Sequence, residues 1–157
     1  MTVSDQTAEA GRRTETELQP QGGTASLPNP EHALEKFFHG RPLEMNLYGI
    51  FAAAVQERLP HVITRFRRSQ ITFSGRRGFA AVWIPPFKVR GRPEHYIVVS
   101  FAADRRIDHP RIVSVAEPYP HRWTHHVLVS SPEDVDDKLL DWVEQAYRLT
   151  NARQIGK

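Results

Sequence analysis

The sequence predicts one α+β domain with a mostly antiparallel sheet. Two segments with apolar residues at helical spacing come first, short segments of alternating apolar and polar residues follow, and one helical segment comes last. No helical segment lies between the expected strands, so parallel crossovers are excluded. We therefore expect an N-terminal helix pair, a sheet of about five or six strands, and a C-terminal helix packed on one face.

The first residues differ in composition from the rest of the chain. Residues 1–28 contain no aromatic side chain, and their large apolar residues are isolated. Such a segment buries too little apolar surface to offset its backbone entropy. We expect a disordered tail at 1–28, a single α+β domain at 29–150, and a short flexible C-terminus at 151–157.

Two helices are expected at the start of this domain. Asn29 and Pro30 are typical of an N-cap and a first helical position, and Gly40 ends the pattern. A longer helix follows Pro42 and stops before Pro60. Its apolar stripe consists of Leu43, Leu47, Ile50, Phe51, Ala54, Val55 and Leu59.

After Pro60 the apolar period changes to two residues, which indicates strands. The expected strands are 62–67, 70–74, 79–84, 95–101, 112–116 and 124–130. Gly75 and Gly78 flank a turn, so Arg76 and Arg77 form the tip of a hairpin. Alternation along 87–92 would place Lys88, Arg90 and Arg92 on one face.

The last helix has the clearest signals. Ser131 is expected as its N-cap, Pro132 as its first residue, and the acidic residues that follow suit the positive end of a helix. Its apolar stripe consists of Val135, Leu139, Trp142, Val143, Ala146 and Tyr147. We therefore expect Trp142 to be buried against the sheet.

Composition excludes several classes of protein. Hydrophobic residues make up 39% and charged residues 25% of the 157, and there is no cysteine. This balance indicates a soluble globular protein, and the lack of thiols fits a reducing compartment. No apolar run approaches the roughly 20 residues of a membrane span. We expect a cytoplasmic protein without a membrane partner; the oligomeric state stays open.

Charge is distributed unevenly along the chain. Residues 58–122 contain thirteen basic and four acidic residues, whereas the segments before and after this block are acidic. A basic block can attract phosphate groups, an acidic protein surface, or the acidic helices of its own chain. Codon bias can also raise the arginine content without any selection for binding.

The strand that contains Trp123-Thr124-His125-His126, followed by Ser131-Pro132-Glu133-Asp134, resembles a bacterial domain-of-unknown-function family that is sometimes labelled "predicted transport protein". The resemblance runs from about Leu34 to Leu149. It implies paired helices, a curved antiparallel sheet and a C-terminal helix. It also suggests an association with restriction or nucleic-acid systems, and it implies no catalytic residue and no cofactor.

The histidines are candidates for metal ligands or catalytic groups. His125 and His126 are adjacent in an expected strand, so their side chains point to opposite faces and would share a metal only across a bulge. We expect one of them to be buried and hydrogen-bonded and the other to lie at the surface. Trp123, His125 and His126 mark a possible pocket, and we assign no metal ligand.

The carboxylates have simpler explanations than catalysis. Asp136-Asp137-Lys138 resembles part of a nuclease motif but lies at an expected helix start, where acidic residues are favourable. Asp104 and Asp108 lie in an expected turn beside arginines. We therefore assign no catalytic residue.

The basic residues carry the main functional hypothesis. If helices cover one face of the sheet, the basic side chains can converge on the other face and bind nucleic acid or another polyanion. The candidates are Arg65, Arg67, Arg76, Arg77, Lys88, Arg90 and Arg92. A solvated face without a ligand is the simpler alternative. A protein-interaction module with an acidic partner, and a small-substrate enzyme that uses His125 or His126, also remain open.

Overall fold

A computed structural model describes residues 30–152 of the chain. The contacts divide the chain into two units, Met1–Ala33 and Leu34–Lys157. Of the first unit the structure describes only the start of α1 (Pro30–Phe37), and the second unit holds all the other elements. The expectation of a disordered tail at 1–28 lies outside the described residues.

The described elements follow the expected order of helices and strands. After α1 come α2 (Pro42–Arg58), six strands, a short 3-10 helix η1 (Pro132–Asp134) and α3 (Asp137–Asn151). The strands are β1 (Ile63–Phe66), β2 (Ile71–Ser74), β3 (Gly78–Trp83), β4 (Ile97–Ala103), β5 (Ile112–Tyr119) and β6 (Arg122–Val129). The fold is α+β, as predicted.

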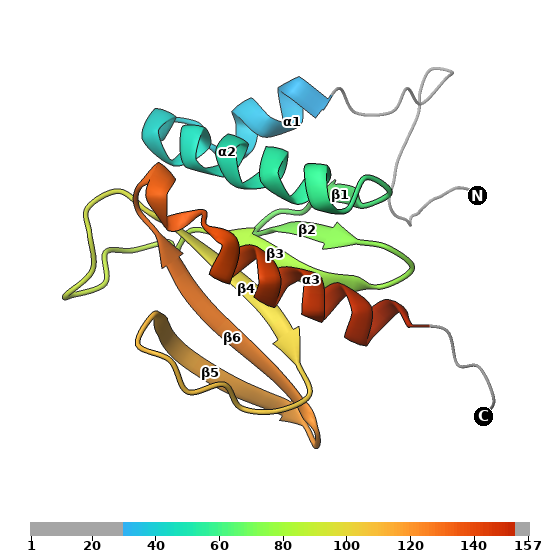
Figure 1. Ribbon diagram of the computed structural model, residues 1–157. Coiled ribbons are helices and arrows are strands. Elements are labelled where there is room, and N and C mark those ends of the chain that lie inside the picture. The colour runs from blue at the N-terminus through green and yellow to red at the C-terminus, as the bar shows by residue number, and fades with distance from the viewer. Residues whose placement is uncertain (1–29, 153–157) are drawn as a thin grey trace, which may run out of the picture. The chain divides into compact units, whose positions relative to one another are not determined.

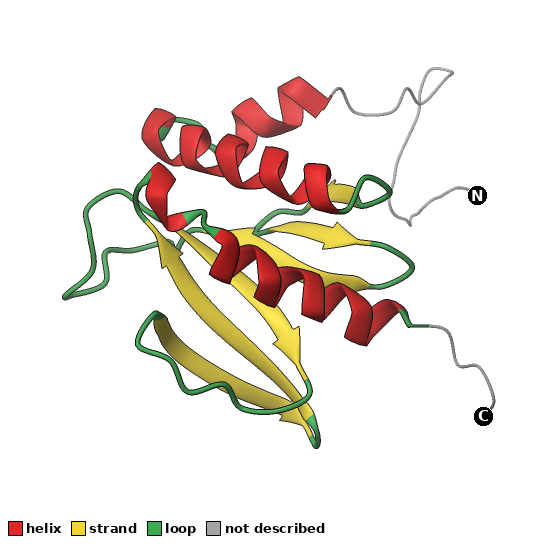
Figure 2. Cartoon of the chain, in the orientation of Figure 1, coloured by secondary structure: helices red, strands yellow, loops and turns green. Residues whose placement is uncertain are grey.

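The six strands form one sheet in the order β1-β2-β3-β4-β6-β5, and every neighbouring pair is antiparallel. β6 lies between β4 and β5, so residues 104–111 must return along the sheet before β5 begins. Helices α2 and α3 lie on the same face of the sheet (Figures 1 and 2). The predicted antiparallel sheet with the C-terminal helix on one face is therefore confirmed.

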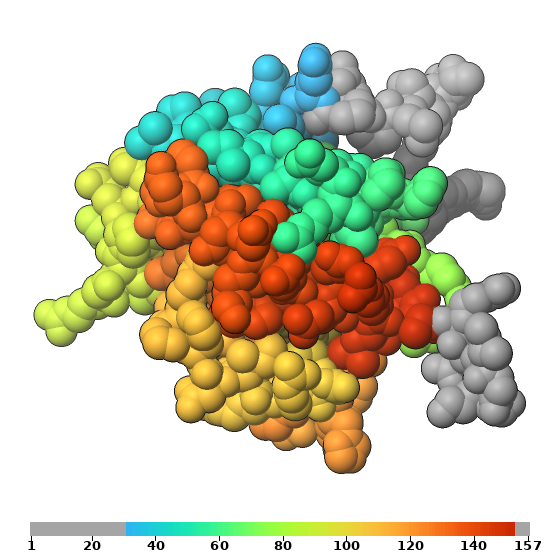
Figure 3. Space-filling model, viewed as in Figure 1, coloured from blue at the N-terminus to red at the C-terminus, as the bar shows by residue number. Residues whose placement is uncertain are grey.

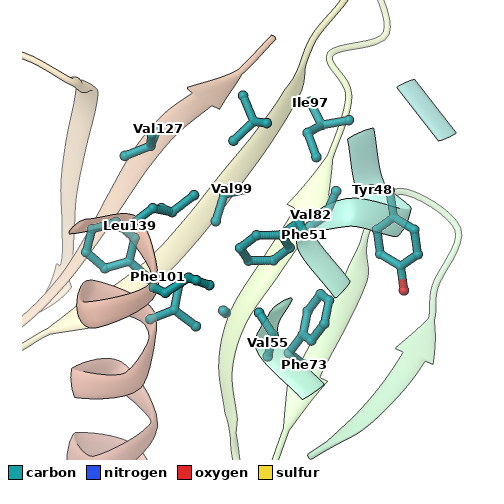
Figure 4. Packing of buried hydrophobic residues seen from close by; sticks show 14 of the residues in the cluster. Tyr48, Phe51, Val55, Phe73, Val82, Ile97, Val99, Phe101, Val127 and Leu139 are labelled. Carbon is teal, nitrogen blue, oxygen red and sulfur yellow. The ribbon is translucent and has the colours of Figure 1, made fainter. Parts of the chain in front are cut away.

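The core lies between this face of the sheet and the two helices (Figure 4). Phe51 of α2 packs against Phe73 of β2, with ring centroids 5.5 Å apart. Trp142 of α3 is 6% exposed, and its ring stacks on that of Phe101 in β4 at 5.5 Å. The prediction that Trp142 is buried against the sheet is thus confirmed.

Arg58 of α2 links the two helices that cover the sheet. Its guanidinium lies 2.7 Å from Asp141 and 3.2 Å from both Asp137 and Glu144, so α2 is tied to α3 by ion pairs. Seen from this side, the side chains of α2 and α3 form a continuous layer (Figure 3). Acidic groups of α3 therefore neutralise a basic residue on the helix side of the sheet.

The start of the last helix differs from the prediction. Ser131 is the N-cap of η1 and not of α3. The Asp134 carboxylate, in η1, accepts hydrogen bonds from the N–H groups of Ser130 and Ser131. The α-helix begins at Asp137, where the Asp136 carboxylate accepts the Leu139 N–H at 3.0 Å. Burial acts to raise the pKa of Asp136, but the Leu139 N–H and Arg111 outweigh it, and the pKa is lowered.

Two further expectations are wrong. Leu43 is 54% exposed, whereas Glu44 is 3% exposed and contacts His95 Nδ1 at 3.1 Å. The hydrogen bond explains how a carboxylate replaces an apolar residue in the buried stripe. Residues 87–92 form a loop and not a strand, with Gly91 at φ 84°, so alternation does not place Lys88, Arg90 and Arg92 on one face.

Candidate functional site: an open cleft on the sheet

The face of the sheet opposite the helices holds the candidate site. Cross-strand partners share a face, and the register aligns one residue from each strand in a continuous row. The row consists of Arg65, Thr72, Ala81, Ser100, His126 and Ser114. We call the surface that contains this row the open face.

A cleft of about 510 Å³ lies on the open face. Its floor consists mainly of small residues, because Ala81, Ser100 and Ala102 leave space above the central strands. Trp83 and His126 are the large partly exposed rings in its lining. The remaining lining residues are Gln70, Thr72, Gly78, Phe79, Ala80, Phe101 and Thr124. A volume of this size is typical of a small-ligand site.

Three side chains in the cleft form a hydrogen-bonded chain. Trp83 Nε1 donates to Ser100 Oγ at 2.8 Å, and Ser100 Oγ lies 2.6 Å from His126 Nδ1. The Trp83 and His126 rings meet edge to face, with centroids 5.8 Å apart and an angle of 87° between their planes. Neighbouring strands β3, β4 and β6 supply the three residues, so the sheet register holds them in place.

The surroundings of His126 favour its neutral form. Burial lowers the pKa of His126, and the positive charge of Arg92 lowers it further. The imidazole is therefore neutral at pH 7, with one nitrogen that donates and one that accepts. Arg92 belongs to the loop between β3 and β4, and its guanidinium lies 5.8 Å from the centre of the Tyr96 ring.

His125 lies on the helix-covered face, so the prediction that the two histidines point to opposite faces is confirmed. It is fully buried and stacks on Phe101, with centroids 5.3 Å apart. Its Nε2 accepts the Ile107 N–H at 2.8 Å, whereas its Nδ1 is buried without a partner. His125 therefore anchors the return segment 104–111 and does not belong to the cleft.

The predicted basic residues share one property: none of the seven has a carboxylate within ion-pair distance in the part of the chain that the structure describes. The arginines of the helix side behave differently. Arg58 and Arg111 pair with acidic residues of α3 and its N-cap, Arg148 pairs with Glu144, and Arg105 pairs with Asp104. Within the described residues, three members of the basic block, Arg58, Arg105 and Arg111, have a carboxylate partner, whereas the seven candidates, like Arg68, Arg106 and Arg122, have none. The unpaired candidates are Arg65, Arg67, Arg76, Arg77, Lys88, Arg90 and Arg92.

Six of these residues lie in the turns and the loop at the two ends of the sheet, and Arg65 lies in the row, on the edge strand β1. Because β1 to β4 are antiparallel, the β1–β2 turn with Arg67 and the β3–β4 loop with Arg92 lie at one end of the sheet. The β2–β3 turn with Arg76 and Arg77 lies at the other end. The seven candidates therefore do not form one patch: none of them lines the cleft, and the turns that carry six of them lie at opposite ends of the sheet.

The three predicted pocket residues do not lie together. His126 lines the cleft, His125 is in the core, and Trp123 does not line the cleft. Sequence reasoning missed Trp83 and Ser100, which are separated by 17 residues and come together only through the register of β3 and β4. The one available signal was that Ala81 and Trp83 alternate with the core residues Ala80 and Val82.

A second hollow of about 480 Å³ lies beside the start of α2, where Glu44 and His95 meet. Among residues 30–152, no group of three or more His, Asp or Glu side chains is placed to hold a metal ion. Within the same residues, no helix has the length and apolar character needed to cross a membrane.

Comparison with protein families matches residues 35–150 to DUF5655, a domain of unknown function. The chain belongs to this family. The DUF5655 match spans α2, the whole sheet and nearly all of α3, so the cleft of this chain lies within the matched residues. No curated protein and no solved structure matches the chain.

Proposed function

We propose that the domain binds single-stranded nucleic acid on its open face and has no catalytic role. The observation that carries this proposal is the combination of a cleft that holds Trp83 and His126 with arginines at both ends of the same sheet that have no ion pair among the described residues. Single-strand binding surfaces use the same two components, because bases stack on aromatic rings while basic residues follow the phosphates.

The separation of charge supports a polyanion as the ligand. Basic residues on the helix side are already neutralised by α3, as in the pairs of Arg58 and Arg111. Those around the open face have no such partner in the described chain. A phosphate backbone could neutralise them and release condensed counterions, which favours binding at low salt.

The shape of the site favours a single strand over a duplex. A shallow cleft floored by alanine and serine admits a flat ring, whereas paired bases of a duplex expose no ring face to Trp83. Trp83 is partly exposed on the sheet and held by Ser100, so its indole is ordered before a ligand arrives. An ordered ring loses little entropy on binding.

The test is binding of fluorescent single-stranded DNA and RNA by the full chain across a salt series. We expect affinity to fall steeply with salt, and Arg76→Glu with Arg77→Glu to lower affinity for all sequences alike and flatten the salt slope. Arg67→Glu with Arg92→Glu, at the other end of the sheet, should have the same effect.

Arg105→Glu with Arg148→Glu is the matched control. It changes the net charge by the same amount, but both residues lie on the helix side beside acidic partners. A loss of affinity equal to that of the open-face variants would show a non-specific charge effect. If the wild-type protein binds neither DNA nor RNA at low salt, the proposal is wrong and an acidic protein partner becomes the better candidate.

A further inference from the structure

The cleft has a chemical feature that the arginines do not explain: none of its lining residues carries a formal charge at pH 7. The polar groups of the lining are Gln70, Thr72, Ser100, Thr124 and His126, and His126 is neutral for the reasons given above. A phosphate placed here would lose water without gaining a cation. The anionic part of a ligand therefore belongs at the ends of the sheet, and an uncharged polar ring belongs inside the cleft.

One hydrogen bond in the chain has a fixed direction, and the direction of the other follows from the nitrogen of His126 that carries the proton. Indole Nε1–H is only a donor, so Ser100 Oγ accepts from Trp83. The hydroxyl proton of Ser100 is then free to point along the 2.6 Å contact to His126 Nδ1. This direction requires a neutral ring that is protonated on Nε2, so that Nδ1 can accept the hydrogen bond.

Nε2 of His126 is available to a ligand. It has no hydrogen-bond partner in the described part of the chain, and among those residues the only buried polar side-chain atom without a partner is His125 Nδ1. Nε2 is consequently accessible, on a ring that lines the cleft. With Nδ1 as the acceptor, the cleft offers one N–H donor, the Nε2–H of His126, on a ring that Ser100 holds in place.

We propose that the cleft accepts a nucleobase through a hydrogen-bond acceptor on its edge, which the Nε2–H of His126 contacts. Ser100 and Trp83 are positioning residues, since they determine which nitrogen of His126 carries the proton. This inference rests on the proposed function, and it adds that the base is recognised by chemistry and not by stacking alone.

The first test measures the proton position directly. Long-range nitrogen–proton NMR spectra of the histidine rings should show His126 protonated at Nε2 and His125 protonated at Nδ1. Ser100→Ala should release the constraint and shift His126 towards a mixture of tautomers. Ser114→Ala is the matched control, because Ser114 faces His126 in the same row from β5 but does not line the cleft. A wild-type His126 protonated at Nδ1 would overturn the inference.

The second test separates base recognition from phosphate binding. Oligothymidylate is compared with an oligonucleotide of the same length in which difluorotoluene replaces thymine, because the two rings have nearly the same shape but only thymine accepts hydrogen bonds well. We expect the wild-type protein to prefer thymine by about tenfold, the worth of one hydrogen bond.

Two substitutions of His126 test whether an N–H group at the position of Nε2 is sufficient, or whether the whole imidazole ring is needed. His126→Gln keeps an N–H near the position of Nε2 and should retain part of the preference, whereas His126→Asn keeps one only near Nδ1 and should lose it. Both should leave the salt slope unchanged. Equal binding of the two oligonucleotides by the wild-type protein, with the salt slope intact, would refute the base contact and leave the proposed function standing. No binding of either oligonucleotide at low salt would refute both.

Discussion

His125 and His126 are neighbours in β6, but they have opposite hydrogen-bonding roles on opposite faces of the sheet. His125 is fully buried, accepts the Ile107 N–H through Nε2, and leaves its Nδ1 without a partner. His126 contacts Ser100 Oγ through Nδ1 and keeps Nε2 accessible. On the covered face, His125 Nδ1 lies without a partner beside the stacked ring of Phe101. On the open face, His126 Nε2 remains accessible to a ligand.

The same contrast extends to the tryptophans. Trp142 lies between the ring of Phe101 and that of His109, whose centroids are 5.5 Å and 5.0 Å away. Trp83 donates to Ser100 and meets the His126 ring edge to face on the open face, which α2 and α3 do not cover. Similar residue types thus stabilise the fold on one face and line an open cleft on the other, because α2 and α3 cover only one face.

The largest effect should come from Trp142→Ala. Removing this ring from the core should lower the free energy of unfolding by about 3–5 kcal/mol, because a cavity remains between α3 and β4. Urea denaturation compares the two tryptophan variants. Trp83→Ala should lower the free energy of unfolding distinctly less than Trp142→Ala does, since the Trp83 ring is partly exposed. A loss below about 1 kcal/mol for Trp142→Ala would show that the helix does not depend on this ring.

Two glycines of the β2–β3 hairpin allow the two faces to be compared by adding one methyl group. A Cβ on Gly75 would lie 2.7 Å from Tyr147 Cε1 and 2.8 Å from Asn151 Oδ1, both on α3. Tyr147 also packs edge to face on Phe79 and has little freedom to move. We expect Gly75→Ala to destabilise the protein by about 1–3 kcal/mol, measured by thermal and urea unfolding.

Gly78→Ala is the counterpart on the cleft side. Its Cβ would lie 3.2 Å from the Thr72 Cγ2 methyl, a side chain that can rotate. The loss of chain entropy in the unfolded state offsets this contact, so the net change should be near zero. Equal destabilisation by the two substitutions would contradict the view that only the α3 side of the hairpin is tightly packed.

Stability should fall as the pH decreases below about 6.5. Burial lowers the pKa of His125, and the charges of His126, Arg106 and Arg105 lower it further; the pKa of His126 is lowered as well. Below pH 6.5 the unfolded chain binds protons that the folded chain does not, so the folded state loses up to about 1.4 kcal/mol per pH unit for each such proton.

Urea unfolding between pH 7.5 and 5.5 measures this effect. His126→Gln removes one of the two groups and should reduce the slope without abolishing it, because His125 remains in the core. A wild-type stability that stays constant over this range would show that neither imidazole excludes its proton in the folded state.

The sequence predicted most of the fold and part of the site. The change from helical to two-residue period located the strands, and alternation alone placed His125 and His126 on opposite faces. Alternation says which residues share a face within one strand but nothing about the register between strands. Trp83, Ser100 and His126 become neighbours only when β3, β4 and β6 are aligned.

Two other features were hidden for a related reason. Glu44 replaces Leu43 in the buried stripe only because His95, 51 residues away, contacts its carboxylate. Arg92 affects His126 only because of the path of an irregular loop. Both depend on long-range contacts, whereas a sequence pattern reports local order.

A small effect on stability is also expected at the tip of the β2–β3 hairpin. The Arg77 N–H donates to Asn151 Oδ1 at 2.7 Å, and Asn151 Nδ2 donates to the Arg77 carbonyl oxygen at 3.3 Å. The turn is therefore held to α3 through its backbone, while the side chains of Arg76 and Arg77 are exposed.

It follows that Arg76→Ala with Arg77→Ala should change the free energy of unfolding by less than about 0.5 kcal/mol. Asn151→Ala should cost about 1 kcal/mol, because it leaves both backbone groups without their partner. Urea denaturation of the two variants compares a side-chain loss with a backbone loss at one turn. If the arginine variant were the less stable of the two, the arginine side chains would have a structural role, and lost nucleic-acid binding in charge-reversed variants could no longer be ascribed to phosphate contacts.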